Sequence, residues 1–185
     1  MEFEHNYGGI KGLVVITPAV FGDERGFFKE TFNEKEFKEN SIDIHWVQAN
    51  HSRSSKGVLR GLHWQKEPHA QDKLVRATTG SVLDVAVDIR KDSPTFGKYA
   101  MVELTENNHK MFLLPRGFAH GFVALSEVVD FEYIVGGSTY NKESERAIIW
   151  NDPDIGIEWG VKDPLVSEKD SNAPRFKDIP ESDLF

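Results

Sequence analysis

The sequence of 185 residues contains no cysteine. Thiolate zinc sites and cysteine nucleophiles are therefore excluded, and the composition fits a reducing compartment. Long apolar runs are absent too, since stretches such as residues 13–16 are far too short to span a bilayer. The acidic start of the chain is followed by no apolar segment, so neither a secretory signal nor a membrane anchor is predicted. We expect a cytoplasmic protein with no membrane partner.

Basic residues are in the minority, with 22 Lys and Arg against 30 Asp and Glu and a formal net charge of −8. General nucleic-acid binding needs a basic face that neutralises phosphates, so we expect no nucleic-acid partner. An anionic small ligand would require a local basic cluster. The length suits one domain over residues 1–185, large enough to bury a core without disulfides or a structural metal.

Short segments rich in Val, Ile, Leu, Phe and Tyr recur between Gly, Pro, Asn and Asp, as in a sandwich or barrel. They predict strands at residues 12–16, 26–32, 58–65, 73–78, 82–89, 111–114 and 131–135. A short helix is predicted over residues 34–39, with Asn33 as N-cap and Glu36 completing a capping box. Half of the eight prolines follow Asp152, which predicts irregular chain wrapping the sheet. Because antiparallel sheets must hide or close their edges, we expect a mainly β fold, a cupin-like jelly-roll sandwich or barrel with a few short helices.

The densest signal for a site lies at residues 58–65, VLRGLHWQ. Strand alternation places Arg60 and Leu62 on one face and His63 on the other. Within fourteen positions the chain carries Arg60, His63, His69 and Lys73, although it is acidic as a whole. Positive charge around a titratable imidazole favours an anionic substrate that must lose a proton. A hydrogen-bonded structural histidine on a solvated basic edge strand is the alternative interpretation.

A second histidine, His120, follows a Pro-Gly turn and sits between small and aromatic residues that allow close approach. A buried histidine bonded to backbone is the alternative here. In metal-binding cupins, a His-x-His pair, a following Glu and a distant His supply the ligands. The matching positions are His63 and Gln65, with Glu67 and His120. Because a glutamine amide is a weak replacement for imidazole, we expect no catalytic metal.

The remaining chemistry is what His, Tyr, Asp and Lys can perform, since the chain also lacks a Gly-x-Gly-x-x-Gly cofactor loop. Proton transfer beside a carbonyl fits this set best. A base removes the α-proton, a cation or hydrogen bond stabilises the enolate oxygen, and an acid returns a proton to the opposite face.

Ordered segments spread over nearly the whole chain carry a family resemblance. They are residues 21–28 (FGDERGFF), 48–52 (QANHS), 59–65 (LRGLHWQ), 73–76 (KLVR), 84–88 (DVAVD), 93–97 (SPTFG), 115–122 (PRGFAHGF) and 166–170 (VSEKD). Together they resemble the dTDP-4-dehydrorhamnose 3,5-epimerase family. The resemblance implies a jelly-roll homodimer that acts on a dTDP-4-keto-6-deoxyhexose without a cofactor.

The resemblance also implies residue roles. His63 would be the base that takes protons from C3 and C5, with Asp170 paired to it. Tyr133 would be the acid on the opposite face, and Lys73 would hold the C4 oxyanion. Substrate binding is implied for Arg25, Glu30, Gln48, Asn50, Arg60, His120, Tyr140, Glu145 and Lys169. Among these, His120 would line the sugar pocket, Arg60 and Lys169 suit the diphosphate, and Tyr140 would stack on thymine.

The chain departs from the family pattern at residues 134–140, where it reads IVGGSTY in place of a Lys-Thr-Thr or similar stretch ending in paired tyrosines. Trp64 also replaces the more familiar Phe after the histidine. Three alternatives stay open from the sequence: a single-carbon epimerase, a ketoisomerase of a related dTDP-keto sugar, and a non-catalytic cupin that binds a sugar nucleotide.

Overall fold

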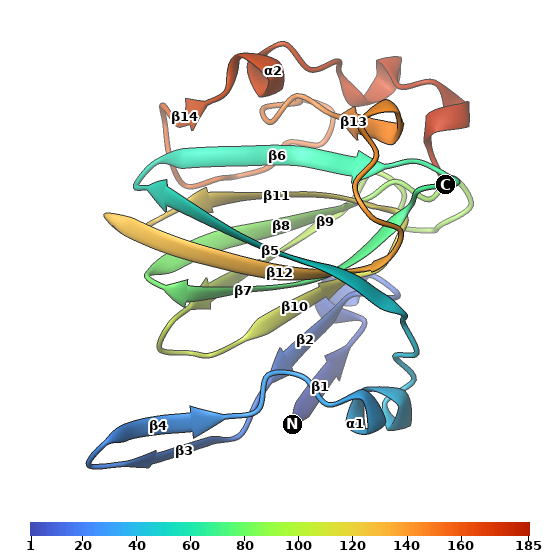
Figure 1. The fold of residues 1–185 in the computed structure, drawn as a ribbon. Coiled ribbons are helices and arrows are strands. Elements are labelled where there is room, and N and C mark those ends of the chain that lie inside the picture. The colour runs from blue at the N-terminus through green and yellow to red at the C-terminus, as the bar shows by residue number, and fades with distance from the viewer.

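A computed structural model describes all 185 residues and contains two six-stranded β-sheets that face each other (Figure 1). The first sheet consists, in spatial order, of β1 (Glu2–His5), β2 (Val14–Thr17), β10 (Met111–Leu114), β7 (Gln71–Thr79), β12 (Val128–Gly137) and β5 (Trp46–Ser55). The second consists of β13 (Glu145–Ala147), β6 (Val58–Gln65), β11 (Phe118–Ala124), β8 (Ser81–Asp88) and β9 (Tyr99–Thr105), with β14 (Leu165–Val166) parallel to β6. All other pairings are antiparallel, and the mainly β jelly roll predicted from the sequence is confirmed.

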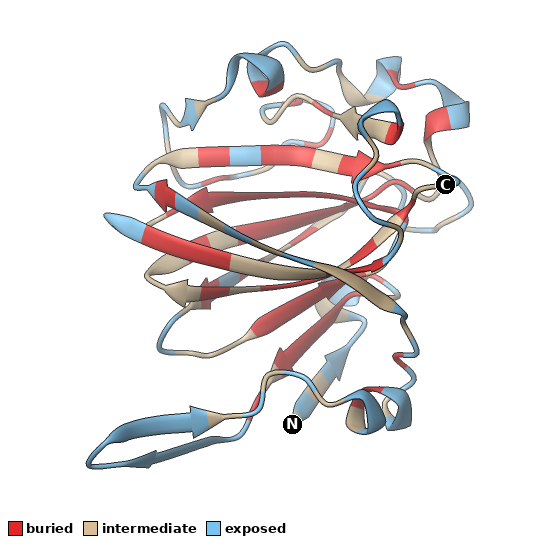
Figure 2. Cartoon of the chain, in the orientation of Figure 1, coloured by how far each residue is buried: buried red, intermediate tan, exposed pale blue.

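The hairpin of β3 (Val20–Asp23) and β4 (Gly26–Lys29) extends away from the sheets (Figure 1). Its residues are almost entirely exposed, as Figure 2 shows in pale blue. Three of its aromatic side chains are more than half exposed: Phe21 at 66%, Phe27 at 60% and Phe28 at 69%. Exposed aromatic side chains on a projecting arm are unusual for a surface that only meets water.

The main core lies between the sheets, where Phe112 and Phe131 of the first meet Phe118 and Phe122 of the second. The rings of Phe122 and Phe131 stack with centroids 4.2 Å apart. These two side chains also line a cavity, so the core ends where that cavity begins.

The tail after Asp152 covers the outer face of the second sheet, which confirms the predicted wrapping. Trp159 and Ile179 pack with Leu62 and Trp64 of β6 in a second apolar cluster. The Trp64 indole N–H donates to the Asp183 carbonyl at 2.8 Å. This cover leaves Trp64 only 4% exposed.

Helix α1 (Glu34–Glu39) has its predicted bounds, and the Asn33 side chain caps it by accepting from the Glu36 backbone N–H. The predicted capping box is only half formed, because the Glu36 carboxylate pairs with the Met1 ammonium instead. Phe37 is buried against the outer face of the first sheet. Neither α1 nor α2 (Glu168–Ser171) has the length and apolarity needed to cross a membrane.

Two predicted strands have different bounds in the structure. The strand predicted at 12–16 begins at Val14, because Gly12 adopts a positive φ of 102° in the preceding turn. The strand predicted at 26–32 ends at Lys29, where the chain leaves the hairpin toward α1. The other predicted strands match observed ones with shifts of a few residues at their ends.

Strand β6 contains a β-bulge, which makes the predicted facing of its side chains wrong. His120 of β11 lies opposite His63, and Phe122 lies opposite Arg60, so three steps along β6 match two along β11. The extra residue reverses the alternation between Arg60 and His63. Both side chains consequently line the same cavity.

Only glycine fits at the bulge. Gly61 has a positive φ of 128°, and a Cβ there would lie 2.5 Å from the Gly121 Cα on the neighbouring strand. The Gly that precedes His63 by two residues is therefore required by backbone packing.

Candidate active site

A cavity of about 620 Å³ opens between the two sheets, and a smaller one of about 340 Å³ adjoins it. The two cavities share His63, Lys73 and Tyr133 in their linings. Together they form one cleft, with these three side chains at the junction. We call the larger part the sugar–diphosphate side and the smaller part the nucleoside side, after the ligand groups that the family resemblance implies for the residues lining them.

His63 is held by a carboxylate that comes from far along the chain. Its Nε2 lies 2.6 Å from Asp170 Oδ1, and the other Asp170 oxygen accepts from the Gly61 N–H at 3.3 Å. Asp170 sits in α2, where its own N–H is capped by Ser167 Oγ. The side chain of Asp170 is 5% exposed, whereas that of His63 is 28% exposed and reaches the cleft.

Asp170 is ionised in this setting. Burial on its own would raise the Asp170 pKa, but the hydrogen bond and positive charge from His63, together with the Gly61 N–H, outweigh burial and lower it. An ionised Asp170 accepts a hydrogen bond from the Nε2–H of His63, so in neutral His63 the lone pair resides on Nδ1. This is the arrangement of a general base with an orienting carboxylate.

Lys73, on β7, lines both parts of the cleft. Burial lowers the pKa of Lys73 from its ordinary 10.5 to about 8, against the opposing effect of the Asp84 and Glu145 carboxylates. The ammonium group is desolvated and makes no ion pair within 4 Å, so its charge is available to a ligand.

A second histidine–carboxylate pair lies deeper in the cleft. His120 Nε2 approaches both oxygens of Asp84, at 3.1 and 2.9 Å. Asp84 is fully buried, and its desolvation raises its pKa in spite of His120 and Lys73 nearby. Asp84 thus anchors His120, and it also lies near Lys73.

Tyr133, on β12, projects into the cleft beside Phe131 and donates no hydrogen bond to the protein. Burial raises the pKa of Tyr133, while the charge of Arg60 opposes this shift. The hydroxyl therefore stays protonated at neutral pH and can act as a proton donor to a bound molecule.

The nucleoside side carries a chain of polar contacts. The Tyr140 hydroxyl donates to Glu145 at 3.0 Å, and Lys169 pairs with the same carboxylate at 2.6 Å. Gln48 accepts from the Tyr140 N–H and donates to Asn50. The Tyr140 ring is 54% exposed and free to contact a ligand.

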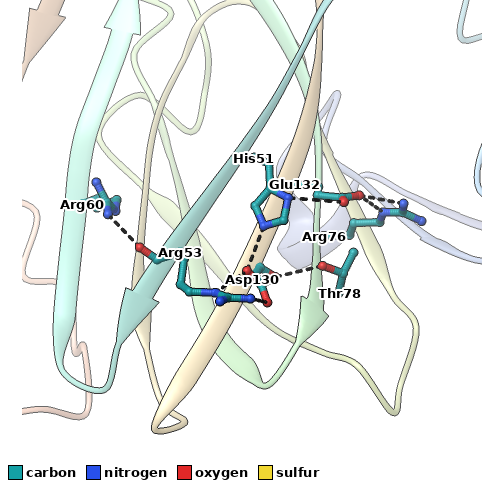
Figure 3. Close-up of polar contacts among 7 residues, drawn as sticks. All are labelled: His51, Arg53, Arg60, Arg76, Thr78, Asp130 and Glu132. Atoms are coloured by element: carbon teal, nitrogen blue, oxygen red, sulfur yellow. Dashed lines mark hydrogen bonds and ion pairs between the residues drawn. The ribbon is translucent and has the colours of Figure 1, made fainter.

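Arg60 lies at the mouth of the sugar–diphosphate side, where it donates to Ser54 Oγ at 3.1 Å. It also donates to the Arg53 carbonyl at 3.3 Å (Figure 3). Lys169 lines the same mouth. Arg25 and Glu30, by contrast, line neither part of the cleft. Arg25 is on the projecting hairpin with a side chain 85% exposed, paired only to Asp23.

The sequence predicts no binding or catalytic role for two buried side chains at or beside the cleft. One is Asp84, which holds His120 and whose sequence signal is a carboxylate inside an apolar strand. The other is Gln65, which the sequence matches only to a metal-ligand position of other cupins, whereas its amide hydrogen-bonds to backbone. Nowhere in the structure do three or more His, Cys, Asp or Glu side chains gather so that they could hold a metal ion.

Comparisons with known proteins identify the family of the chain. Residues 8–178 match the family described as dTDP-4-dehydrorhamnose 3,5-epimerase. A relative of that name from Shigella flexneri is 53% identical over 170 residues, which cover 91% of this chain and 93% of the relative.

Two solved structures are informative. A 3,5-epimerase from Legionella pneumophila in complex with dTDP-4-keto-L-rhamnose has a TM-score of 0.94 and 43% identity, covering 99% of this chain and 96% of that one. A 3'-monoepimerase from Streptomyces bikiniensis in complex with dTDP-quinovose has a TM-score of 0.87 and 31% identity, covering 93% and 87%.

The jelly-roll fold and the named relatives define an isomerase that acts on carbohydrates. More closely, the chain belongs to the dTDP-4-dehydrorhamnose 3,5-epimerase family.

Proposed function

We propose that this enzyme inverts C3 and C5 of dTDP-4-keto-6-deoxy-D-glucose to give dTDP-4-keto-L-rhamnose in dTDP-L-rhamnose biosynthesis. The observation that carries the proposal is the meeting of His63, Lys73 and Tyr133 at the junction of one cleft, with Asp170 behind the histidine.

The C4 ketone makes the hydrogens on C3 and C5 acidic, so neither a metal nor a cofactor is needed for proton loss. His63 Nδ1 takes the proton from C3 and becomes imidazolium, which the Asp170 carboxylate stabilises. The C–H electron pair moves into a C3–C4 double bond and the charge passes to the C4 oxygen. Lys73 holds this oxyanion, and His120 lines the same wall.

Tyr133 then gives its hydroxyl proton to the opposite face of C3, which restores the ketone with inverted configuration. His63 returns its proton through solvent and Tyr133 regains one. The same cycle at C5 completes the reaction. Each half-cycle exchanges one carbon-bound hydrogen for a solvent hydrogen, and no electrons leave the substrate.

The nucleotide is bound by the remaining polar residues. Arg60 and Lys169, at the mouth of the sugar–diphosphate side, give charge-assisted hydrogen bonds to the diphosphate. Gln48, Asn50, Tyr140 and Glu145 line the nucleoside side, where Tyr140 offers its exposed ring to thymine. Arg60 and Lys169 together form the local basic cluster that lets an acidic protein attract an anionic substrate.

The working form is proposed to be a homodimer. The outer face of β5, β12 and β7 carries a ladder of paired charges: Asp130 accepts from Arg53 and His51, and Glu132 accepts from Arg76 (Figure 3). Arg53 and His51 hold the pKa of Asp130 well below its usual range. Because these charged side chains are already paired, a second copy can cover this face without burying an unpaired charge.

The face also has an apolar hollow of about 350 Å³, lined by Phe32, Leu74, Met111 and Ile134 among others. The β3–β4 hairpin projects from the side of the molecule where β1 and β2 lie (Figure 1). We therefore assign Arg25 and Glu30 to the cleft of the partner subunit. The single domain over residues 1–185 and the cytoplasmic location stay predictions.

Replacing both Phe21 and Phe28 by Ser is expected to produce monomers at micromolar concentration, because these side chains are 66% and 69% exposed in one chain. Turnover should fall with dimer content, since Arg25 and Glu30 would no longer reach a partner. Analytical ultracentrifugation alongside activity measures both. A Phe96→Ser control, at a phenylalanine 39% exposed elsewhere on the surface, should stay dimeric. A fully dimeric and active double variant would contradict the assignment.

The rate should fall on the alkaline side with a midpoint near pH 8, because Lys73 must be charged to hold the oxyanion and its pKa is about 8. The sign follows from a cationic group: it is protonated below its pKa and neutral above it. Tyr133 cannot cause this limb, since its pKa lies above 10.0. A profile of kcat/KM from pH 6 to 10 reports the free enzyme. A flat profile to pH 10 would exclude this role for Lys73.

The proposed reaction is tested by NMR of the substrate with chelator-treated protein in deuterium oxide, with the product trapped by its downstream reductase. Deuterium at both C3 and C5 is expected. Exchange at C3 alone would support a single-carbon epimerase, the activity named for the Streptomyces bikiniensis structure. A ketoisomerase would move the carbonyl, and a non-catalytic binding protein would bind the substrate without exchange.

A further inference from the structure

The loop of residues 138–141, which carries Tyr140, is held in place by glutamine side chains from three strands. Gln71 of β7 donates to the Ser138 carbonyl at 3.0 Å. Gln48 of β5 accepts from the Tyr140 N–H at 3.1 Å. The third, Gln65 at the end of β6, makes more contacts than either of the others.

Gln65 hydrogen-bonds to the backbone on both sides of Tyr140. Its Oε1 accepts from the Asn141 N–H at 2.6 Å, and its Nε2 donates to the Thr139 carbonyl at 3.3 Å. The residue is only 4% exposed, so these bonds are made away from water. A single amide thus fixes the peptide groups that precede and follow the tyrosine.

A further bond from Gln65 links this loop to the catalytic strand. Nε2 also donates to the His69 carbonyl at 2.7 Å, two residues before β7 begins at Gln71. Strand β7 carries Lys73. Gln65 therefore sets the spacing between the loop that holds Tyr140 and the strand that holds the lysine.

Only glutamine can make this set of bonds at this position. Two donors and one acceptor are required at the end of one side chain. A carboxylate would face two carbonyl oxygens without a proton, and an imidazole has only two ring nitrogens. The position that matches a metal ligand in other cupins is thus occupied here by a side chain committed to backbone.

We propose that Gln65 is a positioning residue for nucleotide recognition. Its buried amide hydrogen-bonds to the backbone on both sides of Tyr140 and thereby orients the tyrosine ring toward the nucleobase of the substrate. This inference rests on the proposed function, in which Tyr140 stacks on thymine. It adds a determinant of nucleotide affinity that acts through Tyr140.

The experiment is titration calorimetry of the full-length protein with dTDP and, separately, with inorganic pyrophosphate. Gln65→Met keeps the length of the side chain and removes all three bonds. It is expected to weaken dTDP binding roughly tenfold, about what one or two net hydrogen bonds contribute, and to leave pyrophosphate binding unchanged. In turnover, KM should rise in parallel while kcat stays within about threefold of wild type.

A double-mutant cycle with Tyr140→Ala tests the route of the effect. If Gln65 acts through the ring, then Gln65→Met should cost less than about twofold in dTDP affinity once the ring is gone. Gln71→Met, which removes one bond from one side of the loop, is the matched control and should cost less than Gln65→Met. Should Gln65→Met fail to fold, Gln65→Glu, which keeps the bond from Asn141, is expected to show the same split between dTDP and pyrophosphate.

Four outcomes would overturn the proposal: unchanged dTDP affinity in both Gln65 variants, equal losses for dTDP and pyrophosphate, additive losses with Tyr140→Ala, or equal losses in the Gln71 control. Failure of the proposed function is distinguishable, because the wild-type protein would then show no dTDP binding or no exchange at the sugar carbons. If the wild-type protein binds dTDP and exchanges the sugar hydrogens, and Gln65→Met binds dTDP equally well, only the role of Gln65 would be refuted.

Discussion

Replacing His63 by Ala is expected to abolish deuterium exchange at both C3 and C5, with turnover reduced about 10²–10⁴-fold, the usual contribution of a general base. The reason is geometric: His63 is the only imidazole at the junction of the cleft whose second nitrogen is tied to an ionised carboxylate. Affinity for dTDP should change less than threefold, because the nucleotide contacts lie elsewhere. Solvent exchange by NMR and calorimetry with dTDP measure the two quantities.

Two variants complete this test. Tyr133→Phe should mainly damage reprotonation and leave dTDP binding intact, since it removes the hydroxyl and keeps the ring. His69→Ala is the control on the same basic segment. His69 lines neither part of the cleft, and its side chain hydrogen-bonds only to Ser138, so near-normal turnover is expected. Near-wild-type turnover in both the His63 and Tyr133 variants would refute the assigned roles.

The strands could be predicted because their signals are local. Alternating apolar residues bounded by Gly, Pro and Asn located β7, β8, β10 and β12, and the Asn33 cap fixed the start of α1. The facing of β6 could not be predicted, since the bulge depends on the register with β11. A one-residue insertion reverses all later side chains on a strand, and nothing within the strand alone reveals it.

The site could be predicted in part for the same reason. His63, Lys73 and Tyr133 stand in distinctive segments, and the structure brings them together. Asp170 and Asp84 gain their meaning only from contacts with His63 and His120, which lie far away in sequence. Arg25 and Glu30 lie outside the cleft of their own chain, so the structure does not bring them to the other predicted site residues.

The surroundings of Asp170 and Asp84 shift the pKa values of the two carboxyl groups in opposite directions. Asp170 receives bonds from His63, Gly61 and Ser167, and its pKa is lowered. Asp84 is completely buried, and burial raises its pKa. Asp170 is therefore suited to a histidine that must gain and lose a proton, whereas Asp84 holds a side chain in place beside the lysine.

Lys73→Met is expected to lower kcat about 10²–10³-fold, the range found when a donor to a developing oxyanion is removed. Substrate affinity should change little, because the ammonium charge is used in the enolate and not in the ground-state ketone. Lys169→Met is the matched control at the mouth of the cleft. It should raise KM and spare kcat, since that lysine is proposed to bind the diphosphate.

Lys73→Met should lower activity but increase the stability of the folded protein. The ammonium of Lys73 is desolvated to the point that its pKa falls to about 8, so the folded state carries an unfavourable charge there at neutral pH. Lys73→Met should therefore raise the melting temperature while it disables turnover, as expected for a residue kept for function at a cost in stability. The alkaline limb near pH 8 should vanish from the residual activity. A variant that lost stability, kept its kcat and retained that limb would show that Lys73 is structural.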